Sequence, residues 1–94
     1  CALSGNHLAV LHARAREAMT SLGLPADVAG RAIGELMRSA LDNLLALGVP
    51  RGVSGAAARG DLPALGRHAA ALAGPAAELY RVLSGQLVDL LREG

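Results

Sequence analysis

The chain has 94 residues, of which 52% are hydrophobic and 18% charged, with a formal net charge of +1. This length allows one domain with one core but is short for an enzyme with its own cofactor fold. Nine arginines are spread among eight acidic residues, so no basic patch for nucleic acid stands out. The longest uncharged run, residues 2–13, is too short to cross a bilayer. We therefore expect neither a nucleic acid nor a membrane partner.

The start of the chain and its single cysteine bear on where the protein is found and on whether the sequence is complete. The start of the chain lacks the basic region of a signal peptide, and a lone cysteine fits a reducing compartment, so we expect a cytoplasmic protein. The sequence begins at Cys1 without an initiator methionine. We therefore interpret residues 1–94 as a single helical domain cut from a longer protein.

The first predicted helix covers Leu3 to Leu22, and Gly23 ends it. A polar cluster opens this helix, and Ser4 and Asn6 in it are open to two interpretations, local turn chemistry or ligand binding. The first half of the helix has apolar residues on a second side, which favours contact with another element or chain. His7 and His12 are five residues apart, about 140° around a helix, so they cannot share a metal ion. We expect no metal site.

The longest predicted helix runs from Pro25 to Gly48, and its periodicity organises the chain. Its charged residues alternate in sign on the side opposite an apolar stripe. Gly30 and Gly34 lie four residues apart on one flank, where small residues let a neighbouring helix approach. The stripe that we expect to face the core contains Ala26, Ala29, Ile33, Leu36, Met37, Ala40, Leu44 and Leu47.

Residues 49–60 interrupt the helical pattern with Pro50, Gly52 and Gly55. Ser54 is placed to cap a short turn over residues 55–59, with Gly60 ending it and Asp61 capping the next helix. A glycine-rich loop before a helix can hold an anion, although the ending of a Walker loop is missing. An ordinary connector and an anion site both remain possible interpretations of this loop.

Two further helices are predicted, Leu62–Ala73 and Ala76–Arg92, separated by Gly74-Pro75. In the first of them, His68 falls in line with Leu65 and Leu72, so we expect its side chain to face inward or border a pocket. A hydrogen-bonded core histidine and a catalytic histidine are the two interpretations. Four helices with short connections predict an all-α fold, a compact bundle of four main helices.

The order of the motifs adds a family resemblance. The segments are VSGAAARGD (residues 53–61), RHAAAL (67–72) and LYRVLSGQLVDL (79–90), after two long helices. In this order they resemble the C-terminal helical domain of an uncharacterised bacterial family of Rossmann-like oxidoreductases. That family is similar to pyrroline-5-carboxylate reductase and to the 6-phosphogluconate dehydrogenase C-terminal-domain group. The resemblance covers nearly the whole chain.

The most specific part of the resemblance is a Ser/Thr-Gly-Pro-x-x-Arg-Gly-Asp element followed by a helix with a histidine. Six residues match this element, and Ala56 stands where the family usually has proline. Asn6 matches a family asparagine in the first helix. The six matching residues are Ser54, Gly55, Arg59, Gly60, Asp61 and His68.

The resemblance implies a division of labour between two domains. In the family, an N-terminal Rossmann domain holds NADP or NAD, and no such dinucleotide-binding turn occurs in this chain. The helical domain would then shape the substrate pocket and form a homodimer, with no cofactor of its own and no activity alone. The competing hypothesis is a free-standing helical interaction module without a catalytic role. If the parent is a reductase, we expect Ser4, Asn6, Ser54, Gly55 and Arg59 to face its Rossmann half.

Overall fold

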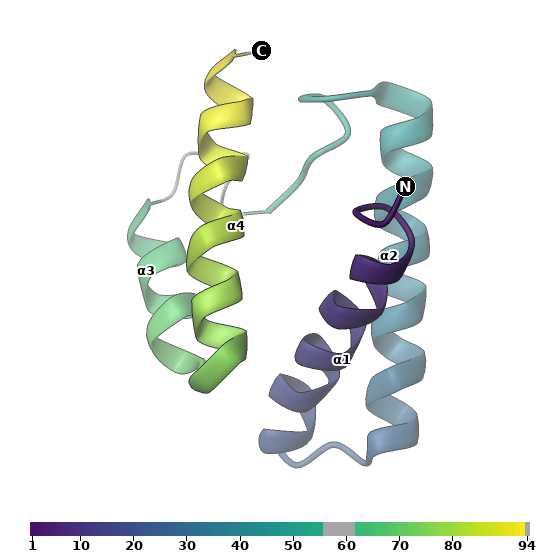
Figure 1. Ribbon diagram of the computed structural model, residues 1–94, viewed down its shortest axis with the longest axis vertical. Helices are drawn as coiled ribbons and strands as arrows, with labels where there is room; N and C mark the ends of the chain where they lie inside the picture. The colour runs from purple at the N-terminus through teal and green to yellow at the C-terminus, as the bar shows by residue number, and fades with distance from the viewer. Residues whose placement is uncertain (56–61, 94) are drawn as a thin grey trace. The chain divides into compact units, whose positions relative to one another are not determined.

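The computed structural model describes residues 1–55 and 62–93, and within these ranges every regular element is an α-helix. The four helices are α1 (Asn6–Ser21), α2 (Ala26–Leu47), α3 (Leu62–Ala71) and α4 (Gly74–Glu93), as Figure 1 shows. The expected all-α fold class is therefore confirmed. Backbone packing divides the chain into two compact units, residues 1–38 and 39–94, with the boundary inside α2.

Helix α1 begins three residues later than the predicted start at Leu3. The N–H groups of Ser4 and Gly5 both donate to the carbonyl of Cys1, at 3.2 and 3.1 Å, so a turn precedes the helix. The helix ends at Ser21, one residue before the predicted Leu22; Leu22 N–H donates to Met19 O at 3.1 Å, and Gly23 follows with a φ of +102°. A glycine adopts that backbone conformation without the steric cost of a side chain.

The other helix ends follow the glycines and prolines, with shifts of one or two residues. Helix α2 ends at Leu47, one residue before the predicted end at Gly48, and Gly48 has a φ of +69°. Helix α3 ends at Ala71, earlier than predicted, and α4 begins at Gly74 rather than at Ala76. Pro75 thereby occupies the first turn of α4, where its missing N–H leaves no hydrogen bond unmade.

The first unit is a hairpin of α1 and the N-terminal half of α2 (Figure 1). Between them, His12 Nε2 lies 2.9 Å from the carbonyl oxygen of Gly30 and is positioned to donate to it. A Cβ atom at Gly30 would meet side-chain atoms of Arg16 and His12 at 3.6 and 3.7 Å. Gly30 thus faces α1, as predicted from the glycine spacing. The same prediction was wrong for Gly34, where a Cβ atom would have no neighbour within 4 Å.

The core is much smaller than the apolar stripe of α2 predicted. Among the described residues, Ala29 and Ile33 are the buried hydrophobic side chains. Farther along the expected stripe, Leu36 is 63% exposed, and Leu44 and Leu47 are exposed too. Periodicity identifies the apolar side of a helix but does not say what covers it, which is why the expected extent of the core was wrong.

The second unit contains the end of α2, the loop after it, α3 and α4. Gly52 is buried in that loop and its N–H donates to the carbonyl of Gly48 at 2.7 Å. A Cβ atom on Gly52 would lie 2.7 Å from the carbonyl oxygens of Asn43 and Gly48. The loop therefore packs against the end of α2 at a distance that only glycine permits.

Candidate functional site

His68 on α3 and Tyr80 on α4 form a polar contact between these two helices. His68 Nδ1 lies 3.1 Å from the Tyr80 hydroxyl oxygen, and the two rings meet edge to face with centroids 6.3 Å apart. Both residues lie six positions from Gly74, where the antiparallel pair of helices reverses direction. This symmetry in the sequence was the signal that could have identified Tyr80 as the partner of His68.

The inward position predicted for His68 is wrong, because its side chain is exposed. The prediction that it is hydrogen-bonded is confirmed. Tyr80 is half-buried, and its hydroxyl group is the hydrogen-bond partner that we expected His68 to find in the core. The structure therefore presents His68 at the surface of the α3–α4 pair, with Tyr80 holding one edge of its ring.

The Tyr80 contact determines what the imidazole can do. In one neutral tautomer, Nδ1 accepts a hydrogen bond from the Tyr80 hydroxyl group and Nε2 carries the ring's own proton. Nε2 is then a hydrogen-bond donor for a carbonyl or carboxylate group. A charged ring would donate from both nitrogens, to the Tyr80 oxygen through Nδ1 and to a ligand through Nε2.

Ser54 and Gly55 lie at the last described positions before residues 56–61. Ser54 is exposed, and Gly55 has a φ of +90°. The capping turn expected over residues 55–59, together with Arg59, Gly60 and Asp61, lies outside the described residues. The described part of the element thus presents the exposed hydroxyl group of Ser54 beside that segment.

Ser4 and Asn6 belong to the first unit, whereas Ser54, Gly55 and His68 belong to the second. Ser4 Oγ donates to the carbonyl of Cys1 at 3.0 Å, which is the local turn chemistry considered for it. Asn6 is the first residue of α1 and is exposed. Within the first unit, the Ser4 hydroxyl group therefore donates to a backbone carbonyl group, and the Asn6 side chain faces solvent.

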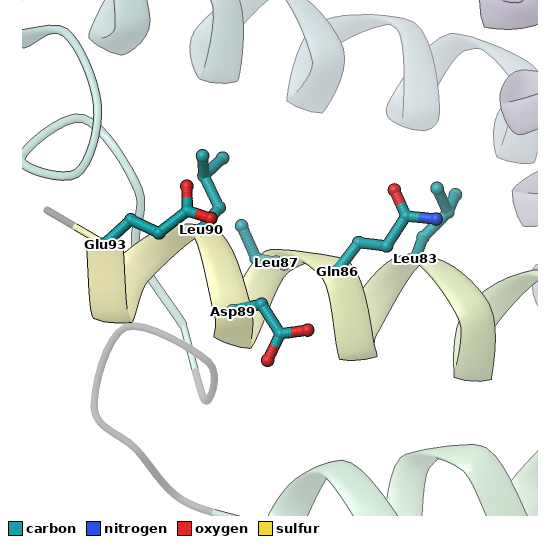
Figure 2. A pocket seen from close by; sticks show the side chains of 6 residues that line it. All are labelled: Leu83, Gln86, Leu87, Asp89, Leu90 and Glu93. Atoms are coloured by element: carbon teal, nitrogen blue, oxygen red, sulfur yellow. The ribbon is translucent and has the colours of Figure 1, made fainter.

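An open depression of about 460 Å³ runs along α4 and was not predicted from the sequence. Figure 2 shows its lining, with leucines and polar side chains projecting from one helix. Leu90 is 44% exposed, so an apolar surface is available to a partner there. The lining residues are Leu83, Gln86, Leu87, Asp89, Leu90 and Glu93.

Across residues 1–55 and 62–93, no three His, Cys, Asp or Glu side chains come together in a way that could hold a metal ion. None of the helices in these ranges combines the length and the apolar character of a membrane span.

Comparison with known proteins identifies the family of the chain. No curated protein and no solved structure gives a significant match. Residues 1–87 match the family described as a domain of unknown function, DUF2520. Because this match spans most of the 94 residues, the chain belongs to the DUF2520 family.

Proposed function

We propose that this chain is the substrate-side and dimerisation domain of a cytoplasmic, bacterial NAD(P)-dependent oxidoreductase. The nicotinamide cofactor would bind in a Rossmann domain elsewhere in the parent protein, and the helical domain would supply the substrate pocket. The proposal includes the fold: the helices would form a bundle like that of the 6-phosphogluconate dehydrogenase C-terminal-domain group. It is supported by the order of sequence motifs that resembles such oxidoreductases.

The observation that carries the proposal is the amount of apolar surface left exposed on the helices. Large hydrophobic side chains are exposed on α1, α2 and α4, and Leu45 on α2 is 77% exposed. Surfaces of this kind mark interaction sites in monomeric domains. A helical domain that covers a Rossmann domain and pairs with a second copy would bury such surfaces.

The polar groups proposed for the pocket come from the element around Ser54. Ser54 and His68 are exposed and can each donate a hydrogen bond to a substrate. Arg59, from the same element, has a planar guanidinium group that suits a carboxylate or phosphate group. These three residues would orient an anionic substrate toward the nicotinamide of the other domain, while Ser4, Asn6 and Gly55 would border the pocket.

A second candidate function is a free-standing helical interaction module without catalysis. The exposed apolar side chains favour this function as well, because they fit any protein partner. The two functions differ in what precedes the domain. A β-α-β segment with a dinucleotide-binding turn in the parent gene supports the oxidoreductase, and its absence supports the module.

The test of the substrate role uses the full-length parent protein and two loop variants. Arg59→Ala should lower kcat/KM about tenfold or more for an anionic imine or carbonyl substrate, because a charged hydrogen bond is lost. The Kd for NADPH should stay unchanged. Arg51→Ala, an exposed arginine in the same loop, is the matched control and should leave both quantities unchanged. An unaltered kcat/KM for Arg59→Ala, or a loss of thermal stability that explains the change, would remove Arg59 from the substrate site.

A further inference from the structure

One face of α4 has an arrangement of charges that is complementary to itself. Between residues 78 and 92 of α4, seven residues, Gly85 included, lie within about 60° of the direction of Gly85 when the helix is viewed along its axis. Six of them are exposed and Val88 is half-buried, so this face is open to solvent. We call it the Gly85 face, and it consists of Glu78, Arg81, Val82, Gly85, Val88, Asp89 and Arg92.

On the Gly85 face, positions at equal distances before and after Gly85 carry opposite charges. Arg81 and Asp89 lie four residues before and after Gly85, and Glu78 and Arg92 lie seven residues before and after it. In a second copy of α4 running antiparallel and centred on Gly85, each charge would stand level with an opposite charge. Arg81 would meet Asp89 of the second copy, and Glu78 would meet Arg92.

These four charges have no partner within their own helix. In α1 and α2, ion pairs three residues apart are closed, with Arg14–Glu17 at 2.7 Å and Glu35–Arg38 at 3.1 Å. Glu78–Arg81 and Asp89–Arg92 have the same spacing, yet neither closes an ion pair in the described stretch from residue 62 to residue 93. As far as residues 1–55 and 62–93 are concerned, the charges on the Gly85 face are thus available to a partner.

The centre of the face permits a close approach of another backbone. A Cβ atom at Gly85 would have no neighbour within 4 Å, so the space in front of it is open. A glycine in a helix interior lowers helix stability relative to alanine, and close helix packing is one reason to retain it. On either side of the crossing, Val82 would contact Val88 of the second copy. The apolar contact at the centre is thus flanked by the charge pairs.

We infer that α4 pairs with α4 of a second copy of this chain, antiparallel, through the Gly85 face. A two-fold axis makes both copies use the same surface, which is what a self-complementary face requires. The inference rests on the proposed dimerisation role and specifies the surface that performs it. Because its charge pairs are exposed, the dimer should weaken as salt is added, unlike one held by leucines alone.

The test is sedimentation equilibrium of the chain with two charge-reversal variants. Arg81→Glu alone places two pairs of acidic residues in contact across the dimer, and Asp89→Arg alone places two pairs of basic residues in contact. Each variant should dimerise about tenfold or more weakly than the wild-type chain, because attraction is replaced by repulsion at two places. An equimolar mixture of the two variants should dimerise again, since every acidic position 81 then meets a basic position 89. Raising NaCl from about 50 mM to about 500 mM should weaken the wild-type dimer.

A third variant separates the charge pattern from net charge. Arg31→Glu on α2 changes the net charge as Arg81→Glu does, lies outside the Gly85 face, and should leave dimerisation unchanged. Circular dichroism of each variant checks that the helices are retained. Wild-type affinity in both α4 variants, or failure of their mixture to dimerise, overturns the α4 pairing; the proposed dimerisation role survives if the dimer itself persists. A wild-type chain that stays monomeric at every concentration overturns both, while the Arg59 experiment still tests the substrate role separately.

Discussion

Two glycines of α2 and its following loop have opposite structural roles. Gly52 touches backbone carbonyl oxygens where a side chain would stand, and its N–H is bonded to Gly48. Gly34 lies inside α2 with open space in front of it. The first glycine is required by close packing of the loop, whereas the second lowers helix stability without filling a contact in the described residues.

This difference predicts opposite effects of the same substitution. Gly52→Ala should lower the free energy of unfolding by about 1 to 3 kcal/mol, because the new methyl group would overlap backbone atoms that cannot rotate away. Gly34→Ala should raise it by about 1 kcal/mol through the higher helix propensity of alanine. Urea denaturation followed by circular dichroism measures both. Equal effects of the two variants would contradict the packing described around Gly52.

His12 is the residue through which α1 and α2 make their polar contact. The distance of 2.9 Å between its Nε2 and the Gly30 carbonyl oxygen requires a proton on Nε2. His12→Ala should therefore reduce the free energy of unfolding by about 1 kcal/mol, the typical value of one hydrogen bond. His7→Ala is the control at an exposed position of the same helix and should change stability by less than about 0.5 kcal/mol. Similar losses in both variants would show that the His12 contact does not stabilise the hairpin.

Helices α3 and α4 are connected by Leu72 and Ala73 and joined by the His68–Tyr80 contact. The hydrogen bond is exposed, so its contribution to stability is modest, but the edge-to-face contact of the two rings adds a second favourable interaction. This pair determines which edge of the His68 ring is available to a ligand. The interaction energy of His68 and Tyr80 therefore affects both the packing of α3 on α4 and the orientation of His68 in the proposed site.

A double-mutant cycle measures that pair directly. His68→Ala and Tyr80→Phe should each destabilise the chain, and the double variant should lose less than the sum of the two. We expect a coupling energy of about 0.5 to 1 kcal/mol for adjacent partners in one hydrogen bond. Strict additivity in chemical denaturation would indicate that the two side chains do not interact in solution.

Helix positions were predictable from the sequence because periodicity and helix-ending glycines act locally. The helix predicted from Pro25 to Gly48 and the turn at Gly23 follow from these signals alone. The start of α1 was less predictable, since Ser4 and Gly5 use the Cys1 carbonyl in a turn that competes with the helix. Local chemistry thus accounts for the helices and for most of their ends.

Burial and the candidate site were harder to predict because they depend on contacts between elements. The stripe on α2 identified Ile33 correctly but also included Leu36, which is exposed. The line of apolar residues on α3 suggested an inward His68, whereas Tyr80 holds it at the surface. The sequence places Glu78–Arg81 and Asp89–Arg92 at the same spacing as Arg14–Glu17, so it could not predict that neither α4 pair closes among the described residues.

At the scale of the whole molecule, the exposed leucines on three helices are the central feature. They fit a domain that is completed by other protein surfaces, which in the proposed enzyme are a Rossmann domain and a second copy. In that arrangement, the cofactor carries the hydride chemistry and the helical domain positions the substrate. Cofactor affinity should therefore belong entirely to the rest of the parent protein.

The most direct measurement is a calorimetric titration of NADPH and NADH into the isolated chain and into the parent protein under the same conditions. We expect a Kd in the range of about 1 to 100 μM for the parent with at least one cofactor and no detectable binding to the isolated chain. A parent protein that binds neither nicotinamide cofactor would contradict the oxidoreductase assignment. Micromolar binding to the isolated chain would contradict the division of labour between the two domains.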